Sequence, residues 1–430
     1  MNKTSEKQSM HIILFEDDKV VDLYPITVGR PAFSISVGSL RLLNLARQLG
    51  GEIELIARPH LRDLLREDVP FAWTPARGER KGPILLINAR TAPRYALLNA
   101  WRALTTTPCE RGAAIVSGSS IVAATLNSAE FLPRQEIGCA QLQGILKDLN
   151  LQTVDVGEPI ALLERSSDAV RYHLRYINEN LESRVATGDY CEIADGLFVP
   201  RAVEERPEIG EYFVVDSKNG PVILDKNVKI GPFAFMRGPV YVGRNSRILE
   251  HAAIKDYVAI GSTCKVGGEV EATTIEQYSN KQHHGFLGHS YLGSWVNLGA
   301  GTCNSDLKNS YNEVWQETPA GKSPSRMQFL GCVVGDYAKT AINTSIFTGK
   351  TIGACSMVYG FVTTAVPSFV NYARSFGQTT EISLELMIAT QERMFFRRDV
   401  KQRPCDIKLI RDMYELTRSE RQLANEPLAL

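Results

Sequence analysis

Aliphatic residues recur at every sixth position through the middle of this 430-residue chain. A small or branched residue follows each of them by four positions, from Val228 to Val270. An α-helix repeats near 3.6 residues and a β-strand near 2, so neither element produces this spacing. A period of six predicts a parallel β-helix, in which each hexapeptide forms one short strand and one turn. The aliphatic series comprises Leu224, Ile230, Met236, Val242, Ile248, Ile254, Ile260 and Val266.

The repeat predicts a solenoid over residues 197–375. Three hexapeptides make one triangular coil, and the aliphatic side chains point inward and stack on those of the next coil. The spacing returns at Phe286, Leu292 and Leu298, and again from Val334 to Val358. Because three such prisms can bury their flat faces against one another, we expect a homotrimer.

Residues 11–196 alternate between strand and helix patterns, which predicts an α/β domain with a mostly parallel sheet and a ligand site at the carboxyl ends of its strands. A polar tail, 1–10, precedes this domain, and a helical tail, 376–430, follows the solenoid and is expected to pack on its end or on a neighbouring subunit. The expected strands are 12–15, 52–57 and 83–88, and the expected helices are 37–50, 61–67, 95–104 and 169–182.

The bulk composition does not point to nucleic acid or a membrane as a partner. The formal net charge is +0 at pH 7, so no electrostatic excess favours nucleic acid or a membrane surface. No apolar run reaches the roughly 18 residues that a membrane helix needs, and the first ten residues lack the apolar core of a secretory signal. The 8 cysteines form no Cys-x-x-Cys pair. We therefore expect a cytoplasmic protein.

The densest group of chemically active side chains lies between Ser279 and Thr302 and contains 3 of the 7 histidines. This run resembles the acetyltransferase half of the bacterial bifunctional enzymes that make UDP-N-acetylglucosamine. Their motif is similar to His-x-x-Tyr-Leu-Gly, one further hexapeptide, and Asn-Ile-Gly-Ala-Gly-Thr. The resemblance implies that His283 is the catalytic histidine and that Asn297 is the motif asparagine.

These roles agree with the chemistry of acetyl transfer. A neutral histidine, with an ordinary pKa near 6.5, can accept the proton that an amine loses when it attacks a thioester. An asparagine can hold the substrate or polarise a carbonyl. Phe286 falls on the family's tyrosine, and Tyr291 or His289 is a candidate to replace the missing hydroxyl. The alternatives for His284 and His289 are hydrogen-bonded turn residues, or a three-histidine zinc site without a matching fourth ligand.

The resemblance also implies where the substrates bind. Arg237 matches a phosphate-contacting arginine, and a guanidinium fork suits phosphate. The family's second cation falls on Glu271, which is a departure. A polar excursion from Asn304 to Phe329, which includes Lys308, matches a segment that helps to build the site between subunits, and a solvated loop is the alternative. Coils 334–362 then line a channel for acetyl-CoA.

The N-terminal domain resembles the sugar nucleotidyltransferases. The segment 23–27, Leu-Tyr-Pro-Ile-Thr, followed by Pro31, is similar to their Leu-x-Pro-Leu-Thr-x-x-x-Pro run. The family's lysine after this proline is Ala32 here, whereas Arg30 lies one residue before it, and we expect Thr27 and Arg30 to contact an NTP or a sugar phosphate. The family's glycine-rich phosphate loop is absent, and Asn88 stands where the family keeps a magnesium-ligating aspartate. The remaining candidates for Mg²⁺ are Glu16, Asp17 and Asp18, for which a solvated loop is the alternative.

The sequence therefore predicts a nucleotidyltransferase-like, Rossmann-like α/β domain, a left-handed parallel β-helix and a C-terminal helical tail. Our main hypothesis joins nucleotidyl transfer to a sugar 1-phosphate with acetyl transfer from acetyl-CoA to an amino sugar. One alternative keeps only the acetyltransferase, with a degenerate N-terminal binding domain. The other is a non-catalytic trimeric scaffold that binds sugar nucleotides.

Overall fold

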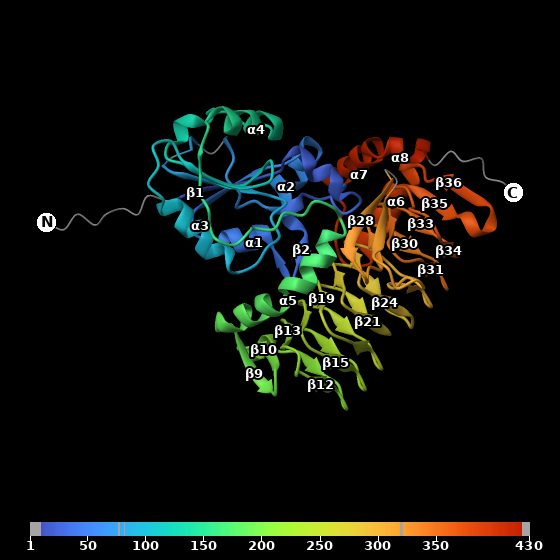
Figure 1. Cartoon of the computed structure of the whole chain (residues 1–430). Coiled ribbons are helices and arrows are strands. Elements are labelled where there is room, and N and C mark those ends of the chain that lie inside the picture. The colour runs from blue at the N-terminus through green and yellow to red at the C-terminus, as the bar shows by residue number, and fades with distance from the viewer. Residues whose placement is uncertain (1–9, 76–77, 81, 319–320, 424–430) are drawn as a thin grey trace. The chain divides into compact units, whose positions relative to one another are not determined.

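The computed structural model describes residues 10–75, 78–80, 82–318 and 321–423, so nearly all of the predicted polar tail lies outside it. The chain forms two compact units (Figure 1). The first contains the residues up to Val21 together with 30–35 and 40–164. The second contains 22–29, 36–39 and everything from Arg165 onward.

The first unit is built on a six-stranded mixed sheet of order β4-β1-β5-β7-β6-β8. The expected parallel pairing holds for β4, β1 and β5. The antiparallel hairpin β6–β7 then interrupts it, because β7 pairs antiparallel with both β5 and β6. The strands are β1 (His11–Phe15), β4 (Glu52–Ile56), β5 (Ile84–Asn88), β6 (Ala113–Ser117), β7 (Ser120–Leu126) and β8 (Gln152–Thr153).

One core of this unit lies between the sheet and α4, where Ile13, Leu86 and Ala124 pack with Leu142 and Leu146. The first expected helix is shorter than its apolar pattern, because residues 36–41 form the short strands β2 (Ser36–Val37) and β3 (Leu40–Arg41). The helices are α1 (Leu42–Arg47), α2 (Arg62–Asp68), α3 (Leu97–Thr106) and α4 (Cys139–Asp148).

The second unit contains the parallel β-helix that the six-residue repeat predicts, and this prediction is confirmed. Its coils present three faces, each a stack of short strands (Figure 1). Face 1 comprises β10 (Leu197–Pro200), β13 (Val222–Leu224), β16 (Val240–Val242), β19 (Val258–Ile260), β22 (Thr274–Ile275), β25 (Tyr291–Leu292), β29 (Cys332–Val334) and β32 (Lys350–Ile352).

The other two faces follow the same order. Face 2 comprises β11 (Glu208–Ile209), β14 (Lys229–Ile230), β17 (Arg247–Ile248), β20 (Lys265–Val266), β23 (Asn280–Lys281), β30 (Lys339–Thr340), β33 (Met357–Val358) and β35 (Val370–Ala373). Face 3 comprises β12 (Val214–Asp216), β15 (Phe235–Arg237), β18 (Ala253–Ile254), β21 (Glu269–Glu271), β24 (Phe286–Gly288), β26 (Cys303–Asn304), β31 (Ser345–Ile346) and β34 (Phe361–Val362).

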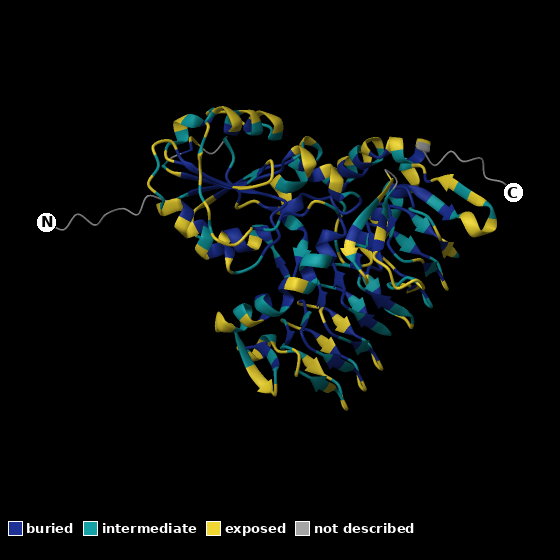
Figure 2. Ribbon diagram, in the orientation of Figure 1, coloured by how far each residue is buried: buried dark blue, intermediate teal, exposed yellow. Residues whose placement is uncertain are grey.

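Inward side chains form continuous buried rows along the solenoid. Figure 2 shows the buried residues of the coils in dark blue on the ribbon. On face 2 the strand register aligns Ile230, Ile248, Val266 and Lys281. Each of them is at most 4% exposed. Each buried aliphatic side chain in such a row contributes about 1.5–3 kcal/mol relative to an exposed one, which is how coils that cannot fold alone become stable together.

The coils from Val222 through Val240 to Val258 each advance by 18 residues. The coil that follows Val266 is shorter, because only Gly267 and Gly268 connect β20 to β21. The long interruption is the antiparallel hairpin β27 (Val314–Thr318) and β28 (Gly321–Met327), which joins the end of the face 1 sheet.

Helix α5 (Asp168–Ala186) packs on face 1, where Ile177 and Leu181 meet Ile223 and Ala259. Its His173 is fully buried and bonds the carbonyl of Tyr257 at 2.7 Å. After β36 (Gln378–Glu381), the C-terminal tail forms α6 (Leu384–Phe396), α7 (Pro404–Leu416) and α8 (Arg418–Leu423). The ring of Phe395 lies 4.5 Å from that of Trp295, so the tail packs on the solenoid as expected.

Candidate active site

His283 lies in the exposed turn 282–285, which connects β23 on face 2 to β24 on face 3. The turn is attached to both neighbouring coils. The amide of Gly301 donates to the His284 carbonyl at 3.1 Å, and the amide of Glu269 donates to the Gly285 carbonyl at 3.2 Å. The imidazole of His283 is exposed and makes no hydrogen bond or ion pair with any described residue, so it is accessible to a ligand.

Asn297 is exposed on face 2, one coil after Asn280. The Asn280 amide group donates to Asn297 Oδ1 at 3.2 Å, and Lys339 lies on the following coil. Asn280 begins the strand that leads into the His283 turn. The structure thus places His283 and Asn297 on successive coils, without a direct contact between their side chains.

Tyr291 is fully buried on face 1, and its hydroxyl donates to Glu276 Oε1 at 2.7 Å. The amide of Ser36 donates to the same carboxylate oxygen at 2.9 Å. A side chain enclosed in this way has no surface for a substrate, so Tyr291 cannot supply the hydroxyl that is missing at Phe286.

Arg237 lies on face 3 and forms an ion pair with Asp256, with Nη2 2.6 Å from Oδ2. The hydrogen bond to Asp256 raises the pKa of Arg237. The register of β15 and β18 places Lys255 next to Arg237 on the following coil, and Lys255 pairs with Glu269. Two adjacent cations therefore line this face, each beside a carboxylate, and Glu271 occupies the next coil.

A second histidine is held much more firmly. His289 Nδ1 lies 2.8 Å from Asp306 Oδ2, and the ring of Phe329 stacks on the imidazole at 5.1 Å between centroids. Asp306 and Phe329 are the two ends of the hairpin excursion, which closes through a bridge between Leu307 and Phe329. A carboxylate on Nδ1 fixes the tautomer and leaves Nε2 for another partner.

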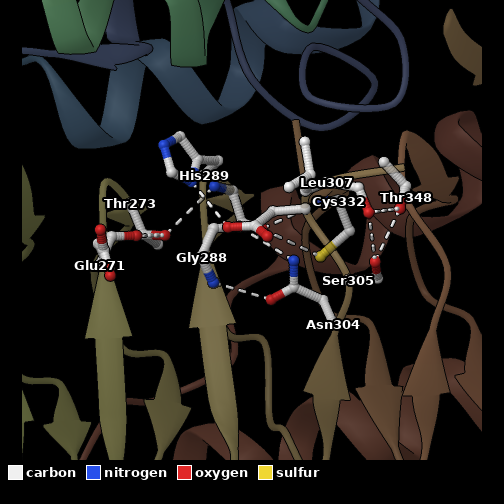
Figure 3. A network of polar contacts seen from close by, with 11 residues as sticks. Glu271, Thr273, Gly288, His289, Asn304, Ser305, Leu307, Cys332 and Thr348 are labelled. Carbon is white, nitrogen blue, oxygen red and sulfur yellow. Dashed lines mark hydrogen bonds and ion pairs between the residues drawn. The ribbon is translucent and has the colours of Figure 1, made fainter. Parts of the chain in front are cut away.

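The polar network around this pair is shown in Figure 3. Asn304 is buried, and its amide group bonds the backbone of Gly288 twice, at 2.8 Å and 3.0 Å. Asn304 therefore holds β24 against the next coil rather than facing solvent. Lys308 is half-buried and donates to the carbonyl of Glu313 at 3.2 Å, within the excursion.

Coils 334–362 form a regular end of the solenoid, with inward Val334, Ile346, Ile352, Val358 and Val362. Several outward side chains beside them are exposed: Ile342, Phe347, Tyr359 and Phe361. These side chains give this end of the solenoid an exposed apolar surface.

In the first unit, the carboxylates at the strand ends are already paired. Glu16 is fully buried and accepts from the backbone amide and the Nε of Arg58, at 2.9 Å and 3.0 Å. Asp17 accepts from Arg90 Nε and Nη2, each at 2.6 Å, and from the Asn88 amide at 2.8 Å.

These contacts occupy the lone pairs that a hard cation needs, so the residues do not fit the Mg²⁺ site that the resemblance implies. Of the three candidate ligands, only Asp18 is exposed. In the described parts of the chain, no group of three or more His, Cys, Asp or Glu side chains is arranged to hold a metal. The three histidines of the zinc alternative are likewise not arranged in this way.

Thr27 and Arg30 fall in different compact units, because residues 22–29 belong with the solenoid. Thr27 is fully buried, and Arg30 is 8% exposed with its carbonyl accepting from Arg58 Nη2 at 2.9 Å. None of the described helices is both long and apolar enough to cross a membrane.

Residues 12–187 match the family model for sugar nucleotidyl transferases. A bifunctional protein GlmU of Acaryochloris marina is 28% identical over 172 residues, which cover 35% of this chain and 34% of that protein. A bifunctional sugar-1-phosphate nucleotidylyltransferase/acetyltransferase of Sulfurisphaera tokodaii is 30% identical over 142 residues, which cover 33% and 35%. The matched region thus spans only 34–35% of the length of these relatives.

Among solved structures, the UDP-N-acetylglucosamine acyltransferase of Francisella novicida covers 52% of this chain and 86% of its own, at 17% identity. Its TM-score of 0.28 is too low to support an argument about fold or function.

Three features of the site were not predicted from the sequence. Lys255 could have been found, because it follows Arg237 by one regular coil of 18 residues. The pairing of His289 with Asp306 could not, because its partner arrives from the next coil at the start of an irregular excursion. The burial of Lys281 could not be predicted either, because the six-residue repeat is interrupted at that point of the sequence.

Proposed function

We propose that the solenoid transfers the acetyl group of acetyl-CoA to the amine of an amino-sugar phosphate. The observation that supports this most directly is the exposed pair His283 and Asn297, on successive coils of a hexapeptide β-helix. Relatives that carry both a nucleotidylyltransferase and an acetyltransferase name support the same assignment.

In this reaction the amine nitrogen attacks the thioester carbonyl and forms the amide bond. His283 accepts the proton that the amine loses, and the C–S bond breaks as coenzyme A leaves and is protonated to its thiol. Asn297 holds the amino sugar or the developing oxyanion. Arg237 and Lys255 would bind the sugar phosphate, which must compete with Asp256 and Glu269 for them. Asn304 would support this site through its bonds to the backbone of Gly288, and Lys308 would act from the excursion.

His289 is the rival base, because Asp306 orients it and leaves Nε2 available. The roles of the two histidines are distinguished by comparing His283→Ala with His289→Ala. The assay measures release of the coenzyme A thiol with glucosamine 1-phosphate as the acceptor. We expect turnover to fall at least 100-fold in His283→Ala, as loss of a general base does. Loss of turnover only in His289→Ala would transfer the role of base to His289.

We further propose that the N-terminal unit transfers a nucleotidyl group from an NTP to a sugar 1-phosphate, a proposal supported by its match to the sugar nucleotidyl transferase model. Arg30 is the residue we assign to phosphate binding there. Arg30→Ala should weaken NTP or sugar-phosphate binding and leave acetyl transfer unchanged. Equal NTP affinity in the two proteins would remove Arg30 from the site.

The proposed assembly is a homotrimer, in which faces of adjacent solenoids share the acetyl-transfer site. The described cysteines are all free, which fits a reducing cytoplasm.

A further inference from the structure

Lys281 occupies an inward position of the solenoid that other coils fill with aliphatic side chains. The register aligns it with Val266 on the preceding coil, and Leu298 follows it on the next. Lys281 is only 2% exposed. An ammonium in this position opposes folding, because burial removes its hydration. Any interaction that offsets this loss of hydration must therefore come from the groups that the ammonium contacts.

The Lys281 ammonium donates to two backbone carbonyls, that of Gly267 at 3.0 Å and that of His283 at 2.5 Å. Among the described residues, no other donor reaches the His283 carbonyl oxygen. The next two carbonyls of the turn are bonded by neighbouring coils. Lys281 therefore fixes a carbonyl of the turn that receives no hydrogen bond from the backbone of the described coils.

The space for this side chain comes from two successive coils that lack an inward corner residue. The turn Gly267–Gly268 is too short to carry one, and Gly285 has no side chain where the next turn would place it. A Cβ atom on Gly268 would lie 2.7 Å from Lys281 Nζ and 2.7 Å from the His283 carbonyl oxygen. Four other coils fill this corner with the buried residues Ala234, Ala252, Thr302 and Thr344.

We propose that Lys281 is a positioning residue, which reaches through the interior of the solenoid and holds the turn that presents His283 to the substrate. The inference rests on the proposed role of His283. It predicts that Lys281 contributes to catalysis through the backbone of the turn, without touching the substrate.

The electrostatics of the site agree with this role. Burial lowers the pKa of Lys281 to about 8, while Cys303 and Glu269 act in the opposite direction. The side chain is thus still mostly protonated near neutral pH and can donate to both carbonyls.

The test is Lys281→Met in the full-length protein, because methionine fills the same volume and restores an apolar row. We expect the variant to remain folded and at least as resistant to urea as the wild type. Hydrogen exchange at the amide of Gly301, which donates to the His284 carbonyl of the turn, should accelerate at least 10-fold. The kcat for acetyl transfer should fall about 10- to 100-fold with an unchanged KM for acetyl-CoA.

Leu298→Met is the matched control, because it changes the next side chain in the same row, and it should alter neither readout. Lys281→Leu serves if Lys281→Met folds poorly. Wild-type exchange and kcat in a folded Lys281 variant would overturn the proposal. Faster exchange in a protein without acetyltransferase activity would retain the positioning role and reject the proposed function instead.

Discussion

At the scale of single residues, the buried ammonium of Lys281 makes the free energy of unfolding depend on pH in the alkaline range. Its pKa in the folded protein is about 8, below the ordinary value of 10.5. Between these two values the unfolded chain binds more protons than the folded one, so the free energy of unfolding rises with pH across this window. Below pH 8 both states are protonated and the full penalty of burial is present.

Lys281→Met should therefore raise the free energy of unfolding at pH 7 by about 1–2 kcal/mol, after allowing for the two carbonyls that lose a donor. It should also flatten the rise between pH 8 and 10.5. Urea unfolding at four pH values across this range measures both effects. A variant less stable than the wild type at pH 7 would show that the hydrogen bonds of Lys281 outweigh its desolvation.

At the scale of elements, the attachment of α5 to face 1 contains a histidine that must stay neutral. His173 accepts from the Gly38 amide at 3.2 Å and bonds the Tyr257 carbonyl, so it connects three segments of the second unit. Burial lowers the pKa of His173 to about 4. Because the unfolded chain takes up this proton near pH 6.5, folding stability is lost as the pH falls from 6.5 to 4.

We predict that His173→Gln lowers stability at pH 7 but reduces the further loss on acidification by up to about 3 kcal/mol. Urea midpoints at pH 7 and pH 4.5 give the comparison. The exposed His284→Gln variant is the control, and its acid sensitivity should equal that of the wild type. An acid dependence in His173→Gln as steep as in the wild type would mean that carboxylates carry the effect.

The elements also show what the sequence could predict. The six-residue period identified the solenoid because one inward aliphatic side chain per strand is a physical requirement of stacked coils. The tail helices followed from their apolar periodicity. By contrast, nothing local in 22–29 shows that this segment belongs with the second unit, because its burial depends on distant contacts. The pairing of Asp17 with Arg90 spans 73 residues and could not be predicted for the same reason.

At the scale of the whole molecule, the exposed apolar side chains of face 3 and of the turn after face 2 favour assembly. Phe361 is 57% exposed and Ile342 is 69% exposed. Apolar surface of this kind commonly marks an interface. If the solenoids form the proposed homotrimer, sedimentation velocity should give a particle of three times the 47.7 kDa chain mass.

Phe361→Asp should dissociate that particle, because each copy would bury an unpaired carboxylate at the interface. The circular dichroism spectrum should stay that of the wild type. A wild-type protein that sediments as one chain at micromolar concentration would contradict the shared site.

The central claim is that the solenoid is an acetyltransferase whose base is His283. The most direct measurement is consumption of acetyl-CoA with glucosamine 1-phosphate, by the wild type and by a folded His283→Ala variant of the same oligomeric state. We predict turnover by the wild type and a loss of at least 100-fold in the variant. Equal turnover in both proteins, or none in a folded wild type with any amino-sugar phosphate, would contradict it.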